Sequence, residues 1–313
     1  MLLRVFCLMI LILSVVLGIC HASGIELPKI ITNPMDTLID SQGLGLDLFN
    51  LSKYEQDVLS NTVKPKDILE TFDSIGGNEE TIKLLRQLLI EPLKNKELYS
   101  GKKLLRPPNG IILYGPPGTG KTMLARAIAS EMGGSFISVS PDFVENKFFG
   151  ESEKNIRAIF SLADKMKPSI IFMDEIDGML SRRTCFDQQH VNSCKTQFLS
   201  MMDGVTKRDD SVIVIGATNS IDQVDPAVLR RMRLHLKVDL PDTQGRKDIM
   251  NKIIPLDEVS SELDLDALAE AAEGFSGSDL HEMCKLAAQF ALKNGNDIIS
   301  QDDFIEAQEK LTS

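Results

Sequence analysis

The chain has 313 residues, of which 43 % are hydrophobic and 25 % are charged, and its formal net charge is −11. A chain of this length can hold two compact domains, and its composition is that of an ordinary globular protein. The acidic balance excludes a general nucleic-acid binder, since such a protein normally shows a basic face. The five cysteines form no CxxC pair and no Cys/His ligand spacing, which indicates reduced thiols rather than a disulfide framework.

Residues 1–23 contain an apolar run, residues 5–20, preceded by Arg4. As a helix this run would span about 24 Å, and Leu2 and Leu3 bring it close to the roughly 30 Å of a hydrocarbon core. We interpret it as an N-terminal membrane anchor. The alternative is a secretory signal that is cleaved near Ala22.

Residues 24–67 have a mixed composition with scattered Pro and Gly, which is typical of a linker, and we expect one short helix near residues 54–60. From residue 68 to residue 240, apolar strand-like runs alternate with helical segments. This alternation predicts an α/β domain with a parallel sheet covered by helices on both faces. The expected strands are residues 111–114, 136–139, 169–173, 212–217 and, as the closing strand, 236–239.

Residues 241–313 predict helices only, with Ser300 and Asp303 matching an N-cap and its acidic N3 partner. We therefore expect a small all-α lid domain. Its candidate helices are residues 244–253, 265–273, 278–293 and 300–310.

Residues 115–122 read GPPGTGKT, which fits the phosphate-binding loop pattern G-x-x-x-x-G-K-[ST] between a strand and a helix. Backbone N–H groups and the positive helix end would face a polyphosphate. Lys121 can reach the β and γ phosphates of ATP, and the Thr122 hydroxyl can ligate Mg²⁺. The predicted nucleotide-binding residues here are Gly115, Pro116, Pro117, Gly118, Thr119, Gly120, Lys121, Thr122 and Met123.

An apolar strand ends in Asp174 and Glu175, which places two carboxylates at the edge of the sheet where α/β ligand sites lie. Asp174 can hold Mg²⁺, and Glu175 can act as a general base on the attacking water. Asn219 ends the next strand and could orient that water, although a turn Asn is an ordinary alternative. Arg230 and Arg231 end a short helix and are either solvated surface arginines or arginine fingers that act on a neighbouring subunit.

The order of these motifs resembles that of an AAA ATPase over about residues 70–292. Within that family the chain is most similar to the membrane-anchored mitochondrial sorting ATPases, which extract mislocalised tail-anchored proteins from the outer mitochondrial and peroxisomal membranes. Residues 147–152, 168–177, 195–204 and 274–283 carry this resemblance.

The resemblance implies a P-loop NTPase sheet with a helical lid, a homo-hexameric ring, and membrane protein clients pulled through a central pore. It implies that Arg230 and Arg231 are trans fingers and that Asn219 senses the γ-phosphate. The residues it implies around the adenine and ribose are Ile75, Gly76, Gly277 and Ser278, and those it implies for the client-gripping pore loop are Lys147, Phe148 and Phe149.

The sequence departs from the family pattern at three places, one of which is an apolar anchor that is short. The pore loop has Phe148-Phe149 where the family usually has Trp-Tyr, so aromatic grip is kept but a hydroxyl is lost. After Arg230-Arg-Met the chain reads Arg233-Leu-His235-Leu, where the family tends to have a proline and a basic-plus-aromatic pair. An ATPase needs the cytosolic ATP pool, which favours the uncleaved anchor, a cytosol-facing ATPase domain and a mitochondrial outer membrane location.

Three alternatives are open at the level of function. A microtubule-severing or ESCRT-disassembling relative would usually carry a three-helix docking domain, for which residues 21–66 are too short and too broken. A nucleotide-bound scaffold that does not hydrolyse ATP would have lost the acidic pair or the fingers. A lumenal chaperone ATPase would follow from a cleaved signal, and the scattered cysteines disfavour it.

Overall fold

The computed structural model describes residues 51–99, 102–144, 151–181, 189–208, 211–255 and 257–312. These residues belong to one compact unit, Leu51–Ser313. The expected membrane anchor, most of the expected linker and the pore-loop residues Lys147, Phe148 and Phe149 lie outside the described residues. Among the described helices, none has both the length and the apolar character that crossing a membrane requires.

A six-stranded sheet with the order β1-β3-β4-β5-β2-β6 forms the centre of the described α/β part. The strands β2 to β6 are parallel, as predicted, and every residue of β4 and β5 is buried. The short β1 pairs antiparallel with β3 at the edge, which the sequence did not predict. The strand bounds are β1 Thr62–Val63, β2 Gly110–Tyr114, β3 Ser135–Val139, β4 Ser169–Met173, β5 Val212–Thr218 and β6 Leu234–Lys237.

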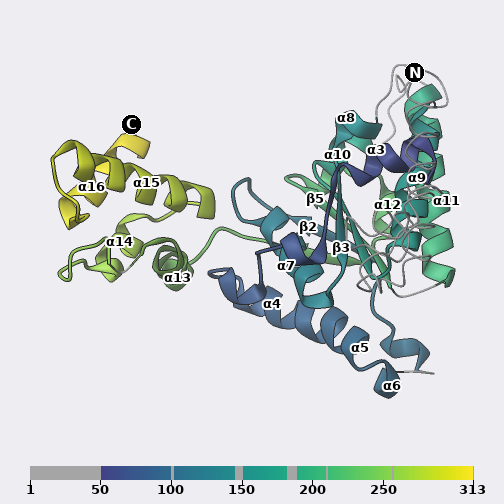
Figure 1. Ribbon diagram of the computed structural model, residues 1–313, viewed down its shortest axis with the longest axis horizontal. Helices are drawn as coiled ribbons and strands as arrows, with labels where there is room; N and C mark the ends of the chain where they lie inside the picture. The colour runs from purple at the N-terminus through teal and green to yellow at the C-terminus, as the bar shows by residue number, and fades with distance from the viewer. Residues whose placement is uncertain are drawn as a thin grey trace, which may run out of the picture. The chain divides into compact units, whose positions relative to one another are not determined.

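Helices cover this sheet (Figure 1). On one face Ile170 and Phe172 of β4 join a core cluster with Leu124 and Ile128 of α7. Because side chains alternate along a strand, Ile171 of β4 points to the other face. The helices of this part are α3 Lys53–Leu59, α4 Glu79–Leu85, η4 Arg86–Ile90, α5 Glu91–Lys94, α6 Lys96–Tyr99, α7 Lys121–Met132, α8 Pro141–Val144, α9 Glu151–Lys165, α10 Ile176–Met179, α11 Gln189–Arg208 and α12 Pro226–Leu229, with short 3-10 turns η2 Pro65–Asp67, η3 Phe72–Ser74, η5 Lys103–Leu105 and η6 Ile221–Gln223.

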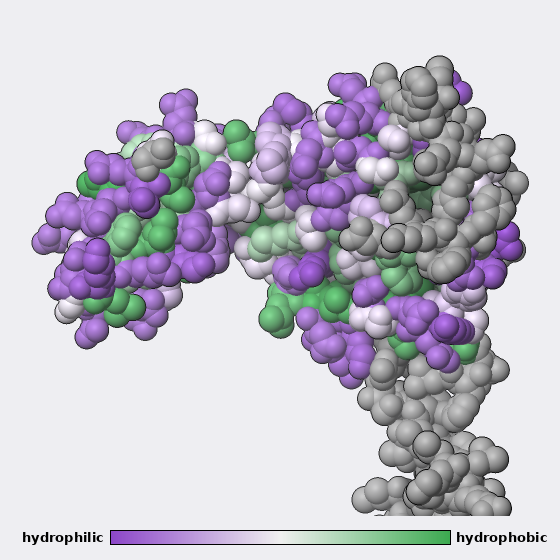
Figure 2. Space-filling model, turned by 90° about the horizontal axis from the view of Figure 1, so that it is seen from above, coloured by the Kyte–Doolittle hydropathy of each residue, from purple (hydrophilic) through white to green (hydrophobic). Residues whose placement is uncertain are grey.

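The C-terminal part is all-α, as expected, and has its own core around Leu280, Met283 and Phe304. The predicted cap at Ser300 is present, since the backbone N–H of Ser300 donates to Asp303 Oδ2 at 2.9 Å. Among the residues that Figure 2 colours, hydrophilic ones cover much of the helical part. The helices are α13 Thr243–Ile253, α14 Leu265–Ala271, α15 Gly277–Lys293 and α16 Gln301–Thr312.

Residues 51–67, which the sequence suggested were the end of a linker, pack on the α/β part. The helix α3 lies where a short helix was expected, and a capping box between Ser52 and Glu55 begins it. The side chain of Glu55 reaches α9, where it accepts hydrogen bonds from Ser161 Oγ at 2.8 Å and Lys165 Nζ at 2.6 Å. Composition indicated a linker here because it does not reveal such long-range contacts.

Candidate nucleotide site

The loop between β2 and α7 has the geometry of a phosphate cradle. Gly115 and Gly118 have φ values of +150° and +75°, which L side chains rarely adopt. A Cβ at Gly115 would lie 2.1 Å from the Val238 carbonyl oxygen, and one at Gly118 would lie 2.5 Å from Ser276 Oγ. Both positions therefore require glycine, and the backbone of the loop is left open to a ligand.

Lys121 is the first residue of α7 and is only 8 % exposed. Its ammonium donates to three neutral oxygens, those of the Gly115 carbonyl at 2.9 Å, the Pro116 carbonyl at 2.7 Å and the Asn219 side chain at 2.9 Å. Burial lowers the pKa of Lys121, and the negative charge of Asp174 opposes this only in part. A buried cation with uncharged partners is suited to receive an anion such as a polyphosphate.

Thr122 and Asp174 lie together at the carboxyl end of the parallel strands, where the Thr122 hydroxyl donates to Asp174 Oδ2 at 3.3 Å. Hydroxyl and carboxylate oxygens are the ligands that Mg²⁺ prefers. The residues present therefore fit a magnesium ion, which Thr122 and Asp174 would hold and which would neutralise phosphate charge.

Glu175 follows Asp174 and is exposed to solvent. Its backbone is in the left-handed region, with φ 48° and ψ 47°, and its N–H donates to Asp174 Oδ1 at 3.0 Å. A non-glycine residue in this conformation carries backbone strain, which is often found at functional sites. The sequence predicted the position of this residue at the strand end but not its conformation.

The predicted adenine-side residues meet the helical part. The backbone N–H of Ser278 donates to the Gly118 carbonyl at 3.1 Å, so the start of α15 touches the phosphate loop. Lys252 of α13 donates to the Ile75 carbonyl at 2.7 Å, and a Cβ at Gly76 would lie 2.7 Å from the backbone of Ile249. Gly277 lies beside Gly118, and Met123 is exposed in the first turn of α7.

Comparison with known proteins agrees with this geometry. Residues 111–241 match the family model "ATPase family associated with various cellular activities (AAA)", and residues 262–306 match the AAA+ lid domain. The "Outer mitochondrial transmembrane helix translocase" of Danio rerio is 41 % identical over 252 residues, covering 80 % of this chain and 70 % of the relative. The chain belongs to the AAA ATPase family.

Other relatives give the same result. The human "Outer mitochondrial transmembrane helix translocase" is 40 % identical over 251 residues, covering 80 % of this chain and 70 % of the relative. The "Mitochondrial sorting homolog" of Caenorhabditis elegans is 40 % identical over 277 residues, covering 85 % of this chain and 81 % of the relative. The AAA ATPase thus hydrolyses ATP, and the expected location at the mitochondrial outer membrane is confirmed.

The two adjacent arginines of this AAA ATPase have different surroundings. Arg231 forms a two-pronged ion pair with Asp203 of α11, with Nε and Nη2 each 2.9 Å from a carboxylate oxygen. This hydrogen bonding raises the pKa of Arg231. Arg230 is exposed, and no residue in the described part of the chain pairs with its side chain. The sequence did not single out Asp203, because it lies 28 residues from Arg231 and no local pattern joins them.

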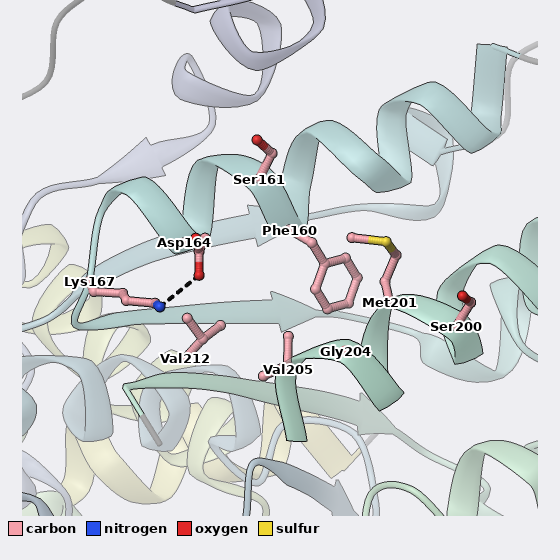
Figure 3. Close-up of a pocket in the computed structure, with 9 residues that line it drawn as sticks. All are labelled: Phe160, Ser161, Asp164, Lys167, Ser200, Met201, Gly204, Val205 and Val212. Atoms are coloured by element: carbon pink, nitrogen blue, oxygen red, sulfur yellow. Dashed lines mark ion pairs between the residues drawn. The ribbon is translucent and has the colours of Figure 1, made fainter. Parts of the chain in front are cut away.

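A cavity of about 350 Å³ lies between α9 and α11 (Figure 3). Phe160 and Met201 line it, Asp164 and Lys167 form an ion pair beside it at 2.6 Å, and Val212, the first residue of β5, is at its floor. The phosphate loop follows the carboxyl end of a strand, whereas this cavity touches the amino end of one. It is therefore separate from the candidate nucleotide site.

Proposed function

We propose that this AAA ATPase forms a homo-hexameric ring, anchored by its N-terminal apolar segment, that extracts tail-anchored or misassembled membrane proteins through a central pore. The proposal is supported by the relatives named as transmembrane helix translocases. The domain limits that go with it are an anchor at 1–23, a linker at 24–67, a large ATPase domain at 68–240 and a lid at 241–313. In this division the packed residues 51–67 join the linker to the ATPase domain.

The observation that carries the ring is an incomplete set of charges at the nucleotide site. Lys121, Thr122, Asp174 and Asn219 converge there. Within the described ranges, however, no arginine hydrogen-bonds or pairs with any of them. Phosphoryl transfer in P-loop enzymes is accelerated by an arginine that stabilises the charge of the transition state. An exposed, unpaired Arg230 on one subunit is suited to supply that group to its neighbour.

The residues of one site then share the chemistry as follows. Lys121 binds the β and γ phosphates, and Thr122 with Asp174 would hold Mg²⁺, which neutralises phosphate charge when bound. Glu175 takes a proton from the attacking water, and Asn219 orients that water. Arg230 reaches the γ-phosphate of the next subunit, while Arg231 holds α12 against α11 through Asp203.

Client contact is assigned to Lys147, Phe148 and Phe149, which lie shortly before α9 in the sequence. Aromatic rings grip a polypeptide of any sequence through apolar contact. The force comes from nucleotide-dependent movement between the lid and the sheet domain, transmitted to this loop.

The test of the trans arginine is a mixed-ring experiment on the full chain in lipid vesicles. Glu175→Gln and Arg230→Ala should each lower ATP turnover at least about 100-fold when assembled alone. Mixing the two variants creates interfaces that pair an intact Glu175 with an intact Arg230, so turnover should partly return. Arg233→Ala, which removes a nearby exposed arginine, is the matched control and should behave like the parent.

Absence of recovery in the mixture, with both variants still binding ATP, would contradict the trans role. Extraction is tested separately with a tail-anchored client in the same vesicles. The double change Phe148→Ala with Phe149→Ala should lower the amount of client released per ATP hydrolysed, and unchanged extraction would remove both residues from the pore.

A further inference from the structure

The short helix α10 connects the two catalytic strand ends. It begins at Ile176, directly after Glu175, and it packs on β5, the strand that leads to Asn219. Ile176 is fully buried against Gly216 of β5, where a Cβ would lie 2.5 Å from Ile176 Cδ1. The absence of a side chain at Gly216 thus allows α10 to approach the strand closely.

One polar contact on this helix has no place in the nucleotide chemistry described above. The hydroxyl of Thr218, a residue that is 2 % exposed, donates to Asp177 Oδ1 at 2.5 Å. The hydroxyl oxygen of Thr218 in turn accepts a hydrogen bond from the backbone N–H of Ser220 at 2.9 Å. The hydroxyl therefore both donates and accepts, which fixes its rotamer and the turn around it.

The turn held in this way is the one that carries Asn219. Thr218 precedes Asn219 and Ser220 follows it, so the two bonds to the Thr218 hydroxyl flank the residue whose side-chain oxygen accepts from Lys121 at 2.9 Å. Asp177 is two residues after Glu175. A charge-assisted hydrogen bond between Asp177 and Thr218 thus connects the end of β4, which carries Glu175, to the end of β5, which carries Asn219.

We propose that Asp177 is a positioning residue for ATP hydrolysis. It acts through Thr218 to fix the position of the Asn219 side chain relative to Glu175. The inference rests on the roles given to Asn219 and Glu175 in the proposed function. A displacement of about 1 Å at a reacting group can lower the rate about 100-fold. A contact that fixes the relative position of Asn219 and Glu175 therefore affects turnover without touching the substrate.

Other contacts keep α10 in place when Asp177 is changed. The backbone N–H of Asp225 donates to the Leu180 carbonyl at 2.8 Å, and Ser181 forms a bridge with Val224. Together with the packing of Ile176, these contacts dock the helix independently of the carboxylate. Loss of Asp177 therefore removes one of the two hydrogen bonds of the Thr218 hydroxyl and leaves its rotamer less constrained, whereas α10 stays docked.

The experiment measures kcat, KM and the affinity for a fluorescent ATP analogue in the full-length protein, together with the melting temperature. Asp177→Ala and Thr218→Val should each lower kcat about 10-fold, with nucleotide affinity changed by less than about 3-fold. Thr218→Ser and Asp177→Asn keep a hydroxyl and an acceptor, so they should recover most of the lost turnover. Asp222→Ala removes an exposed carboxylate a few residues beyond Asn219 and is the control.

The double variant Asp177→Ala with Thr218→Val should lose no more turnover than either single change, because both remove the same contact. An unchanged kcat in Asp177→Ala would overturn the inference, and so would a kcat that falls in Thr218→Ser as far as in Thr218→Val. If Asp177→Ala fails to fold, the Thr218 pair and Asp177→Asn decide the question. Asn219→Ala distinguishes a failure of this inference from a failure of the proposed function, since unchanged turnover in that variant would reject the role of Asn219 itself.

Discussion

Two buried charged residues of the α/β part, Lys121 and Glu55, are partnered in opposite ways. Lys121 is 8 % exposed and Glu55 is 4 % exposed. The ammonium of Lys121 is surrounded by neutral oxygens. The carboxylate of Glu55 is paired with the charged Lys165 and also accepts from Ser161 Oγ and from the backbone N–H of Ser52.

The pKa shifts of Lys121 and Glu55 reflect this difference in their partners. Burial lowers the pKa of Lys121, which means that the charged form is disfavoured. Burial acts to raise the pKa of Glu55, but the hydrogen bonds from Lys165, Ser52 and Ser161 outweigh it and bring that pKa from 4.5 to about 2. The charged form of Glu55 is thus stabilised by the fold itself, whereas that of Lys121 awaits an anion. The Glu55 contact is a permanent ion pair that attaches α3 to α9. Lys121, in contrast, belongs to a site whose anionic partner binds and dissociates.

The largest effect is expected at Lys121. Lys121→Met removes a buried charge whose hydrogen-bond partners are all neutral oxygens and whose burial the charge of Asp174 offsets only in part, so the melting temperature without nucleotide should stay the same or rise. ATP affinity should fall at least about 100-fold, because the charge-assisted bonds to the phosphates are lost. In the parent, ATP at 100 times its Kd should add about 2.7 kcal/mol of stability, and this increment should vanish in the variant. A variant that melts lower than the parent without nucleotide would refute the comparison.

Glu55→Ala should give the opposite pattern. It removes a buried carboxylate and its hydrogen bonds to Ser52, Ser161 and Lys165, and the free energy of unfolding should fall by about 3 kcal/mol. Nucleotide affinity should stay within about twofold, since Glu55 does not contact the phosphate loop. Asp57→Ala removes an exposed carboxylate from the same helix and should cost less than about 0.5 kcal/mol. Equal losses in the two variants, measured by urea unfolding, would show that the contact with α9 adds nothing.

The contrast also shows which features the sequence could predict. The phosphate loop was predicted because its residues are consecutive and the strand and helix around it have clear apolar patterns. Asp174 and Glu175 were placed at the ligand edge because the carboxyl ends of parallel strands meet at one edge of a sheet, whereas Asn219 gained its role from the family resemblance. Neither inference needed any knowledge of which helix packs on which.

The missed contacts join residues that are far apart in the sequence. Asp203 and Arg231 are 28 positions apart, Asp177 and Thr218 are 41 apart, and Glu55 and Lys165 are 110 apart. Side-chain pairs of this kind depend on how helices dock on the sheet, and no periodicity encodes them. For α3 a local signal did exist, since Ser52 and Glu55 have the spacing of a capping box, but it says only where a helix starts.

The smallest expected effect is on the pH dependence of stability, and it tests only the contact of Glu55 with α9. Because the pKa of Glu55 is lower in the folded protein than its ordinary value of 4.5, its stabilising contribution is complete above pH 4.5 and is lost as pH falls toward about 2. Glu55→Gln cannot titrate, so the stability difference between parent and variant should shrink by roughly 2 kcal/mol across that window, allowing for solvent at Lys165. Urea unfolding between pH 6 and pH 2 measures this difference, and the other carboxylates cancel because both proteins contain them. A difference that stays constant over the whole range would mean that the charge of Glu55 does not stabilise the contact with α9 and that its packing and neutral hydrogen bonds suffice.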